Sequence, residues 1–140
     1  MTILGIDFDG TIVTHAYPYI GQPAPHAIEW LKRFNELGAR LILWTMRNGD
    51  MLDQAVEYCK SNGVTFWGIN ENPQQHSWTN SPKAYCHTYI DDAAYGCPLT
   101  DHPESTRKIV DWSIVGPDIE KQLLAELATK NDLIRETRDE

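Results

Sequence analysis

The sequence predicts a single α/β domain with a mostly parallel β-sheet and helices on both of its faces. Short apolar runs, which are typical of buried strands, alternate with segments whose apolar residues recur at helical spacing. Gly and Pro residues separate these segments. Helical connections of this length favour a parallel sheet, because the chain must cross from one end of the sheet to the other between strands.

Length and composition agree with one folded domain over residues 1–140. Hydrophobic residues make up 41% of the chain and charged residues 23%, which is ordinary globular composition. No apolar run is long enough to span a bilayer, so no membrane association is expected. The first residues lack the pattern of a signal peptide, and we therefore expect a cytoplasmic location. Residues 129–140 are polar and predict a frayed C-terminal tail.

The first half of the chain predicts two units of strand and helix. An apolar strand at residues 3–6 opens the chain, and a proline-rich loop follows it. Gly38 ends a helix whose apolar face is formed by Ala27, Trp30, Leu31 and Phe34. Residues 40–44 then predict a buried strand that ends at Thr45. A second helix, before Gly63, has the same spacing at Leu52, Ala55, Val56 and Cys59.

The second half predicts three further strands and a last helix. Residues 64–67 and 85–90 are apolar enough for the third and fourth strands. A fifth strand at residues 112–115 is expected to stop at Gly116, because Pro117 suits the first position of a helix. One face of that helix carries Ile119, Leu123, Leu127 and Ile134.

Polar residues follow three of the predicted strands. Asp7 and Asp9 come after the first strand, Thr45 after the second, and Asp91 and Asp92 after the fourth. Strand residues two apart point to the same side, so Asp7 and Asp9 can face one reaction centre. Ligands of open parallel sheets bind beyond the carboxyl ends of the strands, where all of these side chains are expected. One acid could attack a substrate while the other moves protons.

The charge of the chain restricts its partners. The net charge is −8, and no cluster of Lys or Arg is present that could follow a nucleic-acid backbone, so a nucleic-acid partner is disfavoured. If the four acids at the strand ends converge, a cation is needed to offset their repulsion. The three cysteines form no CxxC pair and are expected to be reduced, packed thiols. Five histidines have no metal-binding spacing and are interpreted as surface or satisfied residues: His15, His26, His76, His87 and His102.

Four segments follow one another in order: Asp7-Phe8-Asp9-Gly10-Thr11, the strand ending in Thr45, Lys83, and Asp91-Asp92. Together they resemble the four motifs of the haloacid dehalogenase (HAD) superfamily of phosphohydrolases. The resemblance spans residues 3–92, about two thirds of the chain. It implies a Rossmann-like three-layer sandwich. Only about fifteen residues separate Thr11 from the first helix, so we expect a small member with no large cap domain.

The resemblance also implies an activity. It predicts a magnesium-dependent phosphatase that hydrolyses a phosphomonoester through an aspartyl-phosphate intermediate. Asp7 would be the nucleophile and Asp9 the general acid and base, with Thr45 and Lys83 completing the catalytic set. The implied substrate-binding residues are Gly10, Thr11, Thr45, Met46, Arg47 and Lys83. The implied Mg²⁺ ligands are Asp7, Asp9 through its backbone carbonyl, Asp91 and Asp92.

Several side-chain roles stay open at this point. Arg47 could clamp a phosphate at a helix N-terminus or be a solvated loop arginine. Lys83 lies only eight residues before Asp91, and Lys60 or Lys108 could take its place. Trp67 and Trp78 could stack on a substrate ring, although packing is the more common fate of tryptophan.

Two other functions also stay open. The phosphoryl group could pass to an acceptor other than water, as in a phosphotransferase or mutase. Alternatively, the chain could be a non-catalytic, phosphate-binding regulatory module. A phosphorylated small molecule is the expected partner, with the loops at residues 12–25 and 70–83 shaping its pocket. An uncapped site also leaves a homo-oligomer open, in which a neighbouring subunit covers it.

Overall fold

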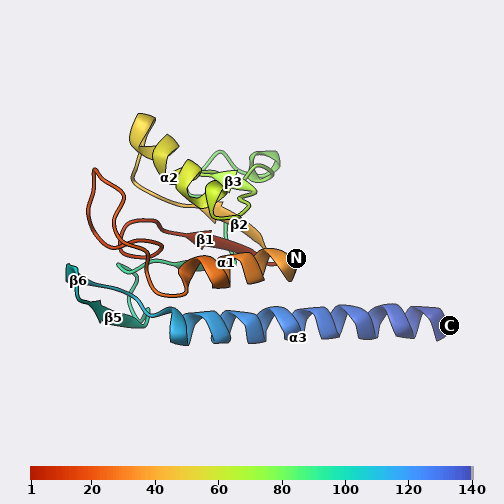
Figure 1. Cartoon of the computed structure of the whole chain (residues 1–140). Helices are drawn as coiled ribbons and strands as arrows, with labels where there is room; N and C mark the ends of the chain where they lie inside the picture. Colours follow the sequence, from red (N-terminus) through yellow and green to blue (C-terminus); the bar gives the residue numbers. More distant parts are fainter. Residues whose placement is uncertain (140) are drawn as a thin grey trace.

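A computed structural model describes residues 1–139 and centres on a four-stranded parallel sheet (Figure 1). Its strands, in the order β3-β2-β1-β4, are β1 (Ile3–Ile6), β2 (Arg40–Leu43), β3 (Gly68–Ile69) and β4 (Thr88–Ile90). β1 pairs with both β2 and β4, and the register sets Ile6 beside Leu43 and Ile90. Because the strands are parallel, the segments that leave β1, β2 and β4 start at one edge of the sheet.

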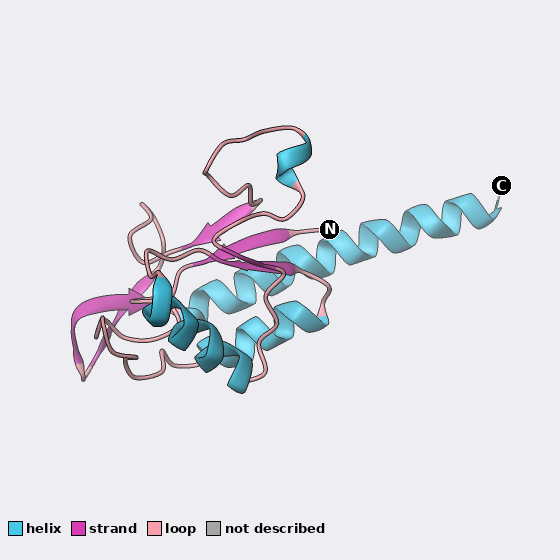
Figure 2. Cartoon of the chain, turned by 90° about the horizontal axis from the view of Figure 1, so that it is seen from above, coloured by secondary structure: helices cyan, strands magenta, loops and turns pink. Residues whose placement is uncertain are grey.

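Three α-helices cover one face of this sheet (Figure 2). They are α1 (Ala27–Glu36), α2 (Gly49–Ser61) and α3 (Trp112–Asp139). Leu41 and Leu43 of β2 point into the core on this side. The helices contribute Leu31, Phe34, Ala55, Cys59, Ile119 and Leu123 to the same core. Burial of these apolar side chains is the main force that holds the helices on the sheet.

The opposite face is covered by residues 70–87, which contain the short 3₁₀ helix η1 (Gln75–Ser77) (Figure 2). Ile42 points to this side and packs with Ala84 and Cys86. The Gln75 side chain holds the irregular backbone in place: its amide nitrogen donates to the carbonyls of Ser81 and Lys83, and its oxygen accepts from the Tyr85 amide. These bonds satisfy backbone groups that no strand or helix pairs.

The predicted small Rossmann-like α/β domain with a parallel sheet is confirmed. The sequence also predicts helices on both faces, whereas all three α-helices of residues 1–139 lie on one face and the other carries only the short η1, because residues 70–87 form an irregular cover there. The helices around residues 27–36 and 49–61 are also confirmed. Two strands are shorter or shifted. The fourth strand covers only Thr88–Ile90, and the third lies at Gly68–Ile69 rather than at residues 64–67. The shift arises because Val64 still closes α2, through a bond from its amide to the Cys59 carbonyl.

The prediction of a fifth strand at residues 112–115 is wrong, because α3 already begins at Trp112. Asp111 starts this helix, and its carboxylate accepts a hydrogen bond from the Ser113 amide at 3.1 Å. Pro117 therefore lies inside the helix rather than at its first position. Gly116 belongs to a packing contact, since a side chain there would collide with the Trp30 ring of α1.

An antiparallel hairpin that the sequence pattern does not predict is formed by β5 (Leu99–His102) and β6 (Ser105–Val110). The hairpin and the start of α3 hold the loop that follows β1. The Val110 amide donates to the Gly10 carbonyl at 3.0 Å, and the Trp112 indole donates to the Thr11 carbonyl at 2.8 Å. Residues distant in sequence thus fix the backbone beside Asp7.

The second half of α3 extends beyond the body of the domain (Figure 1). Side chains 128–138 are exposed, and the helix continues to Asp139 where the sequence predicts a tail from residue 129. Residue 140 lies outside the described residues. Within residues 1–139, no helix combines the length and apolar character needed to cross a membrane.

Candidate active site

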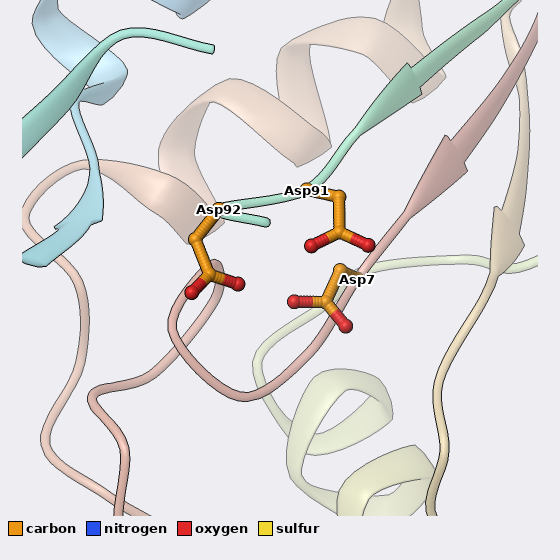
Figure 3. A group of neighbouring side chains, drawn as sticks. All are labelled: Asp7, Asp91 and Asp92. Atoms are coloured by element: carbon orange, nitrogen blue, oxygen red, sulfur yellow. The ribbon is translucent and has the colours of Figure 1, made fainter. Parts of the chain in front are cut away.

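Three carboxylates meet at the carboxyl edge of the sheet (Figure 3). Asp7 leaves β1, and Asp91 and Asp92 leave the neighbouring strand β4. One oxygen from each carboxylate lies within 4.8 Å of the others. The parallel register causes this convergence, because it pairs Ile6 with Ile90 and so sets Asp7 beside Asp91. The structure therefore brings together the acids that the sequence placed after two separate strands.

The environment of Asp7 is unfavourable for a bare carboxylate. Burial, reinforced by the negative charge of Asp91, raises the pKa of Asp7 to about 8. The Thr11 hydroxyl donates to Asp7 Oδ2 at 2.9 Å, which acts in the opposite direction. A bound cation would offset the repulsion and keep Asp7 ionised at neutral pH.

The donor set of this cluster fits a hard cation. Its three members are carboxylates, which suit Mg²⁺, whereas zinc sites usually include thiolate or imidazole ligands. An imidazole lies beside the cluster, because Nε2 of His15 is 2.9 Å from Asp92 Oδ2. His15 therefore orients a carboxylate of the cluster from outside it.

Gly10 shapes the turn between these carboxylates. Its φ of +85° lies in the left-handed region that side-chain-bearing residues rarely adopt. A Cβ atom at this position would collide with the ring of His15 and the carboxylate of Asp92. Glycine thus allows the loop to pass close to the metal-type cluster.

The side chain of Asp9 does not join the carboxylate cluster but pairs with Arg47. Its two oxygens accept hydrogen bonds from Arg47 Nε at 2.8 Å and Nη2 at 2.7 Å. The Arg47 side chain is only 1% exposed, and it also donates to the carbonyls of Tyr19, at 2.7 Å, and Pro18, at 3.3 Å. Arg47 is therefore neither a phosphate clamp nor a solvated arginine, because its guanidinium is directed to protein acceptors.

Two hydrogen bonds hold Thr45 at the end of β2. Its amide donates to Asn70 Oδ1 at 2.8 Å, and its hydroxyl oxygen accepts from the Arg47 amide at 3.1 Å. The hydroxyl proton is left to donate elsewhere. Within residues 1–139, the amides of Phe8, Asp9 and Met46 have no protein acceptor. Thr45 and Met46 line the same pocket as Asp7, and Phe8 and Asp9 follow Asp7 in the chain, so these unpaired donors belong to the segments beside Asp7. Unpaired amides and hydroxyls of this kind suit an anion.

Lys83 does not join the carboxylates. Its ammonium lies 5.6 Å from the centre of the Tyr89 ring, and no carboxylate of residues 1–139 lies within 4.0 Å of it. Lys108 pairs with Asp101 on the hairpin at 3.4 Å. Lys60 lies in the last turn of α2, which runs back towards the amino edge of the sheet. None of the three lysines is held beside Asp7.

No protein-family model matches the chain, and no curated protein matches it. One solved structure, of a conserved protein from Bacteroides thetaiotaomicron, is 37% identical in sequence. The match covers 86% of this chain and 91% of that chain, with a TM-score of 0.71. The chain belongs to the family of this conserved Bacteroides protein.

The similarity to this conserved protein supports the fold described above, including the sheet whose edge carries the carboxylates. The related protein is described only as conserved, so the comparison indicates no activity for this chain.

Three residues near the site were not recognised from the sequence of this family member. His15 was interpreted as a surface or satisfied histidine, and its bond to Asp92 shows that it is satisfied at the site. Asn70 follows β3 as the acids follow β1 and β4, but the third strand was placed too early to reveal it. Trp44 lines the same pocket as Asp7, and strand alternation could have indicated this.

The two tryptophans considered for stacking lie elsewhere. Trp67 packs beneath the Arg40 guanidinium, whose central carbon lies 4.7 Å from the ring centre. Trp78 contacts Tyr85 edge to face, with 5.7 Å between the ring centres. Neither side chain lines the pocket of about 360 Å³ that contains Asp7 and Asp91.

Proposed function

We propose that this chain is a magnesium-dependent phosphatase of the HAD superfamily, which hydrolyses a phosphomonoester through an aspartyl-phosphate. The observation that carries the proposal is the convergence of Asp7, Asp91 and Asp92 beside a set of free donors. A cluster of carboxylates repels an anionic substrate unless a cation is bound. Free amides and a hydroxyl at the same place provide for the anion itself. The two features together support phosphoryl chemistry.

In the first step, an Asp7 carboxylate oxygen attacks phosphorus and forms the aspartyl-phosphate. The bond between phosphorus and the ester oxygen breaks, and Asp9 gives the leaving alcohol its proton. Arg47 occupies one acceptor site on each Asp9 oxygen, so each oxygen keeps a further lone pair for proton transfer. The side chain of Asp9 is 20% exposed and remains open to solvent on one side.

In the second step, water attacks the phosphorus of the intermediate. Asp9, now ionised, accepts a proton from this water, and the bond between Asp7 and phosphorus breaks. Inorganic phosphate leaves, and both aspartates return to their starting states. Thr45 and the amides of Phe8 and Met46 orient the phosphoryl oxygens throughout.

A magnesium ion fits the same site. Asp7, Asp91 and Asp92 would hold it, together with the Asp9 backbone carbonyl and water. When bound, it supplies positive charge that keeps the nucleophile ionised and offsets the charge of the phosphate. Lys83 is left without a role in the reaction.

Hydrolysis of p-nitrophenyl phosphate in the presence of Mg²⁺ tests the proposal. We expect turnover that EDTA abolishes and that Asp7→Asn lowers by about 10³-fold or more. Asp101→Asn is the matched control, because Asp101 is an exposed aspartate on the hairpin. Its turnover should equal that of the unaltered protein.

Three results would contradict the proposal. Turnover that survives Asp7→Asn would exclude Asp7 as the nucleophile. Binding of inorganic phosphate with Mg²⁺, but no turnover of a broad panel of phosphomonoesters, would instead indicate a phosphate-binding module. Transfer of the phosphoryl group to an added alcohol, in preference to water, would indicate a phosphotransferase.

A further inference from the structure

We propose that Trp44 selects substrates whose alcohol part carries a planar aromatic ring. The inference rests on the phosphatase function proposed above and names its substrate class. It concerns the pocket of about 360 Å³ that opens from the reaction centre. Six residues line this pocket: Asp7, Trp44, Thr45, Met46, Asn70 and Asp91.

The strand register places Trp44 directly beside the nucleophile. β1 and β2 are adjacent and parallel, and Ile6 is paired with Leu43, so the next positions along both strands are Asp7 and Trp44. Ile6 and Leu43 both point into the helix-covered core. Their successors therefore project to the opposite side of the sheet, where Trp44 packs with Ile42.

Two apolar side chains line the pocket beside the nucleophile. Trp44 is half-buried and supplies an aromatic wall, while Met46 is 98% exposed at the rim. A methionine side chain is flexible enough to close over a ring that lies on the indole. Ligand pockets commonly measure roughly 300–1,000 Å³, so this one is suited to a single small ring and its phosphate.

The polar groups of the pocket also restrict the leaving group. No lysine or arginine is among its six lining residues, so a second phosphate or a carboxylate would face Asp7 and Asp91 without a counter-charge. Within residues 1–139, Trp44 Nε1 and Asn70 Nδ2 donate to no protein acceptor. A neutral ring with an acceptor at its edge would use these donors, which favours an uncharged aromatic or heteroaromatic group.

A pair of substrates with matched leaving groups tests the inference. Benzyl phosphate and cyclohexylmethyl phosphate have alcohols of similar acidity and size, and they differ in the planarity of the ring. We expect kcat/KM to favour benzyl phosphate, and Trp44→Leu to lower this preference about tenfold. Trp67→Leu is the matched control, because Trp67 packs on the same face of the sheet outside the pocket. Its preference should equal that of the unaltered protein.

The inference is overturned if the unaltered protein hydrolyses both esters equally well. It is also overturned if Trp44→Leu keeps the preference, or if Trp67→Leu reduces the preference to the same extent. Should Trp44→Leu fail to fold by circular dichroism, the preference of the unaltered protein and the binding measurement below decide the question.

Binding of phosphonates separates this inference from the phosphatase proposal, because phosphonates are not hydrolysed. With Mg²⁺ present, benzylphosphonate should bind about tenfold more tightly than methylphosphonate and should shift the indole N–H resonance of Trp44 in an NMR spectrum. The other four tryptophans provide internal references. This result in a protein that lacks turnover would support the ring pocket and contradict the phosphatase. Equal affinities would overturn the ring pocket even in an active enzyme.

Discussion

Arg47 donates to both carboxylate oxygens of Asp9, at 2.8 and 2.7 Å, from a side chain that is almost completely buried. Two parallel bonds of this kind fix the plane of the carboxylate as well as its position. The same guanidinium donates to the Tyr19 carbonyl at 2.7 Å. Arg47 therefore connects the proposed acid and base to the loop at residues 12–25, which borders the site.

Replacing Arg47 with methionine should destabilise the protein. The change leaves the Asp9 carboxylate and the Tyr19 carbonyl without their donor, and the loss of one partner from a buried pair costs about 3 kcal/mol. We expect the free energy of unfolding in urea to fall by about this amount. Adding Asp9→Asn to Arg47→Met should recover part of the loss, since no unpaired carboxylate then remains.

Arg33→Met provides the matched control for this change. Arg33 pairs with Glu120 at 2.9 Å, but its side chain is partly exposed, so solvent already screens the pair. Its loss should change the free energy of unfolding little. Equal effects of the Arg47 and Arg33 substitutions would contradict the structural role assigned to Arg47.

Stability should depend on pH through Asp7. Its pKa of about 8 in the folded state lies above the ordinary value of 3.8, so the folded protein binds more protons than the unfolded chain between these values. Stability attributable to Asp7 is therefore greatest at the acidic end of this window and is lost as pH rises towards 8. With EDTA present, the melting temperature should fall from pH 5.5 to pH 8.5 relative to that of Asp7→Asn.

Comparison with Asp7→Asn removes the contribution of the other titrating groups. Added Mg²⁺ should raise the melting temperature of the unaltered protein more at pH 8.5 than at pH 5.5, because the ion binds the ionised carboxylate. The substituted protein should show a smaller response. Parallel pH profiles for the two proteins, in EDTA, would contradict the raised pKa of Asp7.

The sequence allowed prediction of the site wherever local pattern and sheet geometry agree. Asp7 and Asp91 were expected at one edge because each follows an apolar run, and parallel pairing of β1 with β4 brings these two ends together. Thr45 was found for the same reason, at the end of β2. Strand ends therefore located the carboxylates and the hydroxyl without knowledge of the tertiary structure.

Contacts between distant segments account for most of what was not predicted. Gly116 and Pro117 have the local character of a strand end and a helix start, yet Asp111 caps the helix earlier and Gly116 packs against Trp30. Nothing in the local sequence indicates that a helix from the first half of the chain requires a glycine at this point. Tertiary packing thus overrides local preference here.

The role of Arg47 was unpredictable for a related reason. A loop arginine two residues beyond Thr45 suits a phosphate site, and its actual partners, Asp9 and the Tyr19 carbonyl, lie about 30 to 40 positions away in the sequence. Lys83 shows the reverse case, because its order in the chain matched a motif while its side chain lies over Tyr89. The order of motifs along the chain therefore predicts which segments come together. It is a poorer guide to the direction of long side chains.

Gly10→Ala should damage both stability and metal binding. The left-handed backbone at φ +85° is unfavourable for alanine, and the added Cβ collides with His15 and Asp92. We expect a loss of about 3 kcal/mol in the free energy of unfolding. The displaced Asp92 should also weaken Mg²⁺ affinity, as measured by calorimetry. Gly38→Ala is the matched control, because its φ is +86° and no atom lies within 4 Å of the added Cβ.

The control should lose only about 1 kcal/mol, from backbone strain alone, and should keep its Mg²⁺ affinity. The difference between the two alanine variants then measures the crowding at Gly10. Equal losses of stability and equal Mg²⁺ affinities in the two variants would contradict the claim that the loop at Gly10 passes close to Asp92.

Deletion of residues 131–140 should leave the domain folded. Side chains 131–138 are exposed, and the last part of α3 extends away from the body of the domain, so its removal uncovers little apolar surface (Figure 2). We expect the melting temperature to change by at most about 2 °C, because isolated helical ends contribute little stability. The helical signal in far-ultraviolet circular dichroism should fall in proportion to the residues removed. A larger drop in melting temperature would contradict this expectation. If the melting temperature of the full chain also rose with protein concentration, this end of α3 would pack against a second copy.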